Sequence, residues 1–194
     1  EEINPQKVSS EKAKKVAQNA IALFDSTDRR HTICEIGKER IRRAGAKIAA
    51  ETGEKAAELD RGFRCLRLDT SNMTDVYYAP DAVTQDGLFA QVDNVKEDRT
   101  PEDLLVQTML DLGIPLSASI AVEEIAGKRV FNVADGFLLA CFDRDVTDET
   151  VTAIAKRKPY YAVFRDASMA DDSALTNFDQ LFAAYSPATV RRVL

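Results

Sequence analysis

Several residue types and motifs are scarce or missing in this sequence, and each absence excludes a class of protein. There is one histidine, His31, in 194 residues, so a metal site or catalytic triad that needs several converging side chains lacks support. No apolar run approaches the roughly 20 residues that a membrane helix requires. The sequence has no GxxxxGK(S/T), GxGxxG, GxSxG or HExxH motif, which leaves phosphate loops, serine-hydrolase elbows and zincin chemistry without support.

Cysteine is also sparse. The three cysteines, Cys34, Cys65 and Cys141, are odd in number and widely spaced, and no CxxC pair occurs. This pattern argues against a disulfide framework and against a zinc site. Each cysteine has apolar neighbours, so we expect all three to be small buried hydrophobic residues. With no signal peptide visible at the start, a cytoplasmic protein is predicted, and the first residue, Glu1, suggests a piece of a longer chain.

The charge is unevenly distributed along the chain. Residues 1–60 hold 12 Lys+Arg and 11 Asp+Glu, for a net charge of +1, whereas residues 61–194 hold 14 and 21, for −7. Nucleic-acid binding needs clustered cations that face phosphates. The charge balance therefore argues against nucleic-acid binding along the whole chain. One local segment, residues 29–47, remains a candidate for such a contact, because it holds seven Lys+Arg and two Glu.

Two helices are predicted near the start. Ser9 or Ser10 is typical of a helix cap, and apolar residues recur at helical spacing from there to about Asp25. Thr32 begins a second helix, which we expect to end before Gly53.

The middle of the chain changes pattern. Residues 62–69 alternate apolar and basic side chains, which predicts a strand with one buried face. Residues 73–94 show no period and are predicted to be an irregular linker or insertion. At Thr100 a capping hydroxyl, a proline and two acidic residues begin a helix that we expect to end at Gly113.

The last hundred residues predict a mixed α/β sheet. Three short strand candidates follow one another, and Gly127 and Gly136 between them favour tight hairpin turns. Helix and strand then alternate. We therefore expect an α/β domain over residues 95–194, with a hairpin meander followed by βαβ-like units and helices flanking the sheet. The expected strands are 119–125, 129–133, 137–142, 160–164 and 189–194, and the expected helices are 147–157 and 173–185.

The second helix carries the candidate binding residues. Arg40, Arg43 and Lys47 stack at positions i, i+3 and i+7, and Arg42 lies among them. One interpretation is a contact with the DNA backbone through Arg40, Arg42, Arg43 and Lys47. The other is a solvated face in which Glu39 pairs with Arg43, since runs of charge are commonly only that.

Paired carboxylates offer a second candidate site. Asp166 follows a predicted strand at its C-terminal end, where open α/β sheets place ligands. A small Mg²⁺-dependent enzyme would use the carboxylates Asp143, Asp166, Asp171 and Asp172. Alternatively, Arg165 and Asp166 fix the strand exit, and the later acids stabilise a helix N-terminus. No catalytic, cofactor-binding or metal-binding residue is assigned, because carboxylates without a base or a phosphate cradle define no reaction.

Several stretches resemble the modification (Mod) subunit of type III restriction-modification systems. The first is residues 32–45, TICEIGKERIRRAG, and the next joins GFR at 62–64 to LDTSN at 68–72. The later matches are PEDLL at 101–105, LGIPL at 112–116, and VFRD at 163–166 followed by Asp171, Asp172, Asn177 and Phe182. The resemblance covers most of the chain and is weakest over residues 73–94.

The resemblance implies an N6-adenine DNA methyltransferase that uses S-adenosylmethionine. In that family the catalytic Asp-Pro-Pro-Tyr motif and the Phe-x-Gly-x-Gly cofactor loop precede the matched region, and neither occurs here. The resemblance therefore implies that this chain binds no cofactor and is inactive alone. It implies three partners: a second Mod subunit, the restriction (Res) subunit, and DNA through the parent enzyme, with no membrane involved.

The domain organisation follows from the resemblance. Residues 1–72 are expected to be the tail of the methyltransferase domain, with two helices and a strand, and residues 95–194 the C-terminal α/β domain. The leading expectation is an assembly or accessory role. The terminal strand, 190–194, would either pair across an interface by strand addition or close its own sheet.

Overall fold

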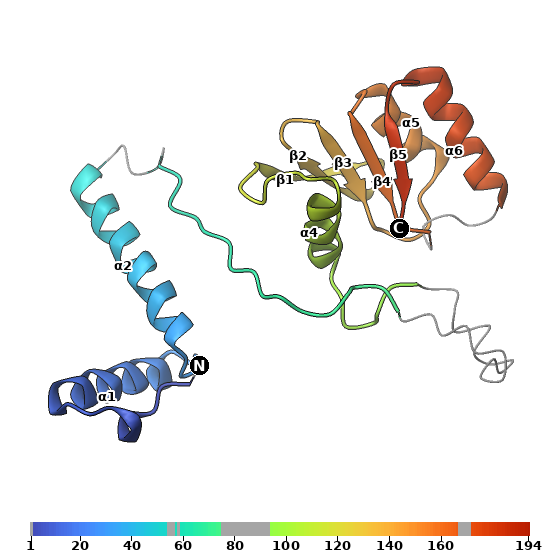
Figure 1. Ribbon diagram of the computed structural model, residues 1–194. Coiled ribbons are helices and arrows are strands. Elements are labelled where there is room, and N and C mark those ends of the chain that lie inside the picture. The colour runs from blue at the N-terminus through green and yellow to red at the C-terminus, as the bar shows by residue number, and fades with distance from the viewer. Residues whose placement is uncertain (1, 54–56, 58, 75–93, 167–171) are drawn as a thin grey trace, which may run out of the picture. The chain divides into compact units, whose positions relative to one another are not determined.

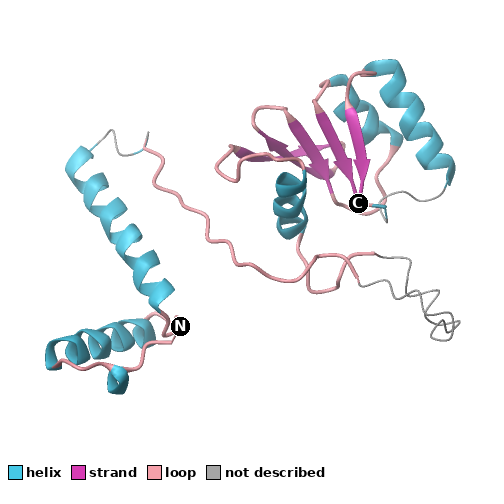
Figure 2. Ribbon diagram, viewed as in Figure 1, coloured by secondary structure: helices cyan, strands magenta, loops and turns pink. Residues whose placement is uncertain are grey.

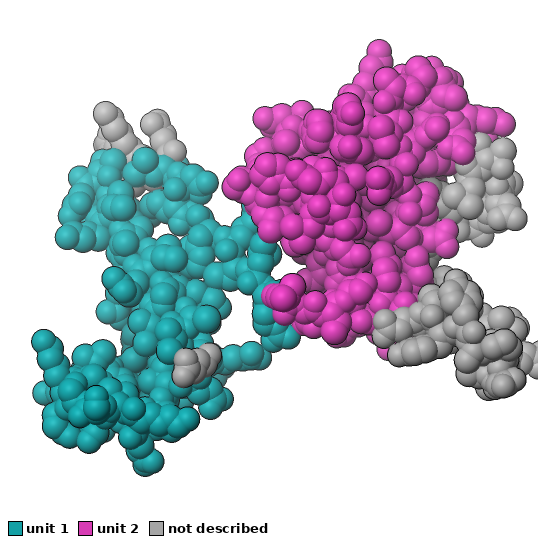
Figure 3. Space-filling view, in the orientation of Figure 1, with its two compact units in different colours: residues 1–67 teal, residues 68–194 magenta. Residues whose placement is uncertain are grey.

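The computed structural model describes residues 2–53, 57, 59–74, 94–166 and 172–194, with the side chains of 172–176 left out. The chain divides into two compact units, residues 1–67 and 68–194 (Figure 3).

The first unit is built from two capped helices, α1 (Glu11–Ser26) and α2 (Ile33–Thr52) (Figure 1). Both start where the caps predict, because Ser10 Oγ accepts a hydrogen bond from the Ala13 amide and Thr32 Oγ1 accepts one from the Glu35 amide. A short 3-10 helix, η1 (Pro5–Lys7), precedes them. Burial is sparse in this unit: α1 buries Ala17 and Phe24, and none of the residues of α2 is buried.

The predicted strand at residues 62–69 is wrong. Residues 61–69 are extended without strand pairing, and all of them are exposed. Leu68 is 98% exposed. The apolar and basic residues do alternate, but no neighbouring strand among the described residues supplies the hydrogen-bonding partner that a sheet needs.

The second unit contains the mixed sheet that the sequence predicts (Figures 1 and 2). The five strands among its described residues lie in the order β1-β2-β3-β4-β5, with the first two pairings antiparallel and the last two parallel. The strands are β1 (Ile120–Ile125), β2 (Lys128–Val133), β3 (Leu138–Cys141), β4 (Tyr161–Phe164) and β5 (Val190–Val193). The helices are α4 (Pro101–Asp111), α5 (Asp148–Lys156) and α6 (Asp172–Tyr185).

Turn chemistry explains the antiparallel half of the sheet. The two residues between β1 and β2, Ala126 and Gly127, both have positive φ, at 49° and 75°, as a two-residue type I′ hairpin turn requires. The parallel half needs crossovers, and α5 and α6 supply them.

Side chains alternate between the two faces of the sheet and give it two cores. Leu139 and Cys141 of β3 face the core formed with α5 and α6, whereas Leu138 and Ala140 face the core formed with α4. Figure 2 shows α4 against one face of the sheet and the α5–α6 pair against the other. The second unit is therefore a three-layer α/β arrangement.

Helix α4 begins with a full capping box. The Thr100 hydroxyl accepts a hydrogen bond from the Asp103 amide, and the Asp103 carboxylate accepts one from the Thr100 amide. These bonds lower the pKa of Asp103 below its ordinary value.

The segment before α4 is partly described. Met73 forms an antiparallel bridge with Val95, whereas the predicted irregular linker, residues 73–94, otherwise lies almost wholly outside the described residues. Within the described part of the chain, no helix is long and apolar enough to cross a membrane.

The cysteine prediction is correct for one residue of three. Cys141 is buried in β3, but Cys34 and Cys65 are exposed. Burial raises the pKa of the Cys141 thiol to about 11. Apolar neighbours in sequence indicate burial only where another element covers that face, and none of the described residues covers Cys34 or Cys65.

Candidate functional site: the basic face of helix α2

The four predicted contact residues all lie on α2, but they do not share one face. An α-helix turns about 100° per residue, so Arg40, Arg43 and Lys47 fall within about 60° of one another, whereas Arg42 lies about 160° from Arg40. We call Arg40, Arg43 and Lys47 the basic face. All three are exposed.

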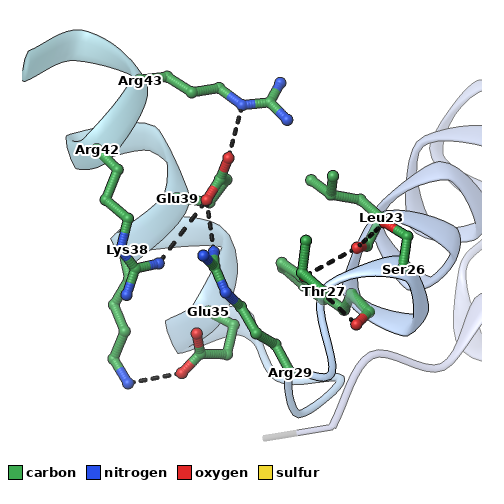
Figure 4. Close-up of polar contacts among 10 residues, drawn as sticks. Leu23, Ser26, Thr27, Arg29, Glu35, Lys38, Glu39, Arg42 and Arg43 are labelled. Carbon is green, nitrogen blue, oxygen red and sulfur yellow. Dashed lines mark hydrogen bonds and ion pairs between the residues drawn. The ribbon is translucent and has the colours of Figure 1, made fainter. Parts of the chain in front are cut away.

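Glu39 brings together two arginines of α2 and one from the turn before it (Figure 4). Its carboxylate lies 2.6 Å from Arg29 and 2.9 Å from Arg43, with Arg42 further away at 3.7 Å. The Glu39 side chain is only 19% exposed. We call Arg29, Arg42 and Arg43 around Glu39 the arginine cluster. The Glu39–Arg43 pair that the sequence predicts is therefore present, as one part of a larger group.

Arg29 was not among the predicted site residues. It lies in the turn between α1 and α2, where its amide donates to the Phe24 carbonyl at 3.0 Å. Its side chain then points to Glu39, ten residues later in the chain (Figure 4). Helical spacing cannot identify such a residue, because Arg29 precedes the helix. The one signal in the sequence was its position at the start of the basic window 29–47.

Hydrogen bonds keep the acids of this site ionised. The bonds from Arg43 and then Arg29 lower the pKa of Glu39, and the bond from Lys38 lowers that of Glu35. Lys38 in turn has a raised pKa because of its bond to Glu35. The charges of the site are therefore fixed at neutral pH.

Positive charge remains after these pairs are formed. Glu39 carries one negative charge against three guanidinium groups. Among the described residues Arg40 has no ion-pair partner, and Lys47 lies 3.8 Å from Glu51 with both side chains well exposed. Such an exposed pair is worth little. The first unit as a whole holds 15 Lys+Arg and 11 Asp+Glu, for a net charge of +4, whereas residues 68–194 hold 11 and 21, for −10.

An extended segment adds to the basic surface of α2. The guanidinium of Arg42 lies over the Phe63 ring, 5.8 Å from its centroid, a cation–π distance. Gly45 faces the Arg61 side chain, with 3.7 Å between the position of a Cβ on the glycine and the Arg61 Cβ. The segment around Arg61 and Phe63 therefore runs beside α2.

The carboxylates of the alternative magnesium site are only partly described. Asp143 accepts a hydrogen bond from the Arg129 amide at 2.7 Å, which ties it to the edge of β2. Asp166 is exposed, and its own amide donates to the Leu194 carbonyl at 2.9 Å. Asp171 and the Asp172 side chain lie outside the described residues. Within the part of the chain that the structure describes, no three acidic, histidine or cysteine side chains are grouped to hold a metal.

An aromatic cleft in the second unit was not anticipated. It has a volume of about 710 Å³ and lies beside the turn after α4 and the starts of β3 and β4. Phe137 and Tyr160 stack at 5.0 Å with an 8° angle between their planes, and Tyr161 meets Phe137 edge-on at 5.6 Å. Phe137 is 41% exposed and Tyr160 54%. None of the described residues that line the cleft carries a charge.

Comparison with known proteins identifies no relative. No family model, no curated protein and no solved structure matches the chain.

Proposed function

We propose that this chain is the C-terminal accessory and assembly part of an N6-adenine DNA methyltransferase, the Mod subunit of a type III restriction-modification system. The proposal starts from the motifs of residues 32–45, 101–105 and 163–166, which fall on α2, on the start of α4 and on β4 with its exit. The resemblance thus extends over both units.

Uncovered apolar surface on the first unit is the observation that best supports this proposal. Val16, Ile33 and Ile41 are 59%, 55% and 50% exposed, although each lies on a helix with an apolar stripe. Most helical stability in proteins comes from packing such a stripe against other elements. Val16 and Ile33 lie together, because both line one groove, and an exposed apolar patch of this kind marks a surface that another body covers. In the proposed protein, the cofactor domain of the methyltransferase covers this surface.

An apolar groove lies within the same unit. It has a volume of about 560 Å³ and opens between η1, α1 and the start of α2. Its walls include Ile3, Val8, Val16, Ile33 and Ile36. The rest of the methyltransferase domain supplies the side chains that fill it.

The chain does not perform the reaction of the parent enzyme by itself. S-adenosylmethionine binds to the part of the parent that carries the Phe-x-Gly-x-Gly loop, and the target adenine to the part with the Asp-Pro-Pro-Tyr motif. Both motifs are missing from this sequence. The proposed partners are a second Mod subunit, the Res subunit and DNA, and the proposed location is the cytoplasm.

The β5 edge offers a surface for assembly of two copies. β5 pairs with β4 on one side and has no partner on the other among the described strands. The amides of Val190 and Leu194 donate to carbonyls of the β4 side. By alternation, the amide of Val193 points away from β4. Strand addition at this edge would join the sheets of two copies.

The first test is the solution mass by light scattering over a concentration series. We expect a concentration-stable dimer of about twice the 21.4 kDa of one chain. Val193→Pro removes the outward amide and is expected to give a monomer, whereas the control Val193→Ala keeps that amide and the dimer. A wild-type monomer at every concentration would contradict the assembly role. Calorimetric binding of S-adenosylmethionine by the chain alone would contradict the accessory assignment.

A further inference from the structure

The arginine cluster has more hydrogen-bond donors than its own acid can use. Each guanidinium presents five N–H donors in a planar fork, whereas one carboxylate offers about four acceptor positions. Glu39 therefore holds Arg29, Arg42 and Arg43 in place and leaves most of their donors directed elsewhere. The arginine cluster with Glu39 carries two net positive charges, and the contacts with Glu39 already orient the guanidinium groups.

Further cations extend from the cluster in a line. Successive residues rise about 1.5 Å along a helix, so Arg40 and Lys47 lie about 10 Å apart along α2, with Arg43 between them. Arg61 lies beside Gly45, about 140° around the helix from Arg40, and is not part of this line. A line of single-sign charge fits a ligand with regularly spaced opposite charges. Each strand of duplex DNA carries one phosphate for about every 3.4 Å along the helix axis, and guanidinium forks match phosphate oxygens bidentately.

We propose that the arginine cluster and the basic face bind the phosphate backbone of duplex DNA, with Arg29 and Arg43 holding one phosphate and Arg40 and Lys47 its neighbours. The choice of DNA as the ligand rests on the proposed function, whereas the argument for a polyanion rests on the charge geometry alone. The contact is independent of base sequence, because no side chain of the group needs to reach a base edge. An anionic partner meets a unit of charge +4 in a chain whose other unit carries −10.

Glu39 acts as a positioning residue that also competes with the phosphate. Its carboxylate takes donors from Arg29 and Arg43 that a phosphate oxygen would otherwise accept, and it places a negative charge beside the bound backbone. Replacing it with glutamine retains the shape of the side chain and removes that charge. DNA affinity and protein stability should therefore change in opposite directions.

The experiment is fluorescence anisotropy of a labelled 20-base-pair duplex with the whole 194-residue chain, between 50 and 200 mM salt. The three phosphates that the proposal places on Arg29 with Arg43, on Arg40 and on Lys47 predict a slope of log K against log salt of about −2.7. The double variant Arg40→Gln, Lys47→Gln is expected to weaken binding and reduce the slope by about 1.8. The control Lys12→Gln, Lys15→Gln removes the same charge from α1, where both lysines are exposed, and should keep the wild-type slope. Circular dichroism checks that both variants keep their helices.

Glu39→Gln is the second arm. It is expected to bind the duplex more tightly, because it removes a negative charge beside the phosphates, while its melting temperature falls. Tighter binding of single-stranded DNA than of duplex, equal losses in the two double variants, weaker binding by Glu39→Gln, or no salt-dependent binding by the wild type would each overturn the proposal. These results leave the dimer measurement untouched, so the DNA contact and the assembly role fail separately.

Discussion

Phe182 joins α6 to the sheet, and its removal tests the core of the second unit. The side chain is 0% exposed and lies 5.0 Å from the Phe178 ring and 6.4 Å from the Phe164 ring. Truncating such a buried phenylalanine to alanine costs about 3–5 kcal/mol, from lost burial and the cavity that remains. Domains of this size have stabilities of roughly 6–19 kcal/mol, so Phe182→Ala should be folded at 25 °C but clearly destabilised.

The expected change in melting temperature follows from the size of the unit. For the 127 residues of the second unit, the entropy of unfolding is about 0.27 kcal/mol per degree. A loss of 3–5 kcal/mol therefore lowers the melting temperature by about 11–19 °C. Tyrosine fluorescence is the suitable probe, because the sequence has no tryptophan and all five tyrosines lie in residues 68–194. The signal reports this unit alone.

Phe137→Ala is the matched control. It deletes the same atoms from a ring that is 41% exposed and stacks on Tyr160. We expect a cost of only about 1 kcal/mol, because much of the ring already meets water. Equal losses in the two variants, or a loss under about 1 kcal/mol for Phe182→Ala, would refute the assignment of Phe182 to the core.

Two further predictions concern titratable groups. In a thiol-reagent assay of the native protein at pH 8, Cys34 and Cys65 should react quickly, whereas Cys141 should react only after unfolding, because it is buried and its pKa is raised to about 11; three fast thiols would contradict this. The pKa values of Glu35, Glu39, Asp103 and Glu123 are lowered by hydrogen bonds, for Glu123 from Asn132 first and then Arg157. Carboxyls with depressed folded-state pKa values stabilise the protein above their unfolded values of about 4 and lose that contribution as pH falls through the folded values. The melting temperature should thus be nearly constant from pH 7 to 5 and fall below about pH 4, and a flat profile down to pH 2 would count against the sign of these shifts.

Local signals in the sequence were enough for the elements whose ends are fixed by their own residues. Ser10, Thr32 and Thr100 cap the helices that they were expected to cap, because a cap is a bond between residues three apart. Gly127 likewise indicated a hairpin turn, because the positive φ that such a turn needs is a property of the turn residue itself. The mixed sheet followed from the order of these elements.

Predictions of burial failed where the covering surface would have to come from another part of the protein. The alternation in residues 62–69 and the apolar neighbours of Cys34 and Cys65 both predict burial, but burial requires a partner that sequence periodicity does not identify. Arg29 shows the converse case. Its role depends on a turn that brings it to Glu39, and no spacing rule connects a loop residue to a position ten residues away.

The order of the sheet has a consequence for how the second unit is made. Every strand pairs with its neighbour in sequence, so each newly synthesised strand adds to an edge that already exists and never has to insert between two others. Chains fold as they leave the ribosome, N-terminal parts first, and contacts between sequence neighbours close early at a small entropic cost. The sheet can therefore grow during translation one strand at a time, with the two antiparallel hairpins as its template and β5, at the C-terminal end, as the last strand to be added.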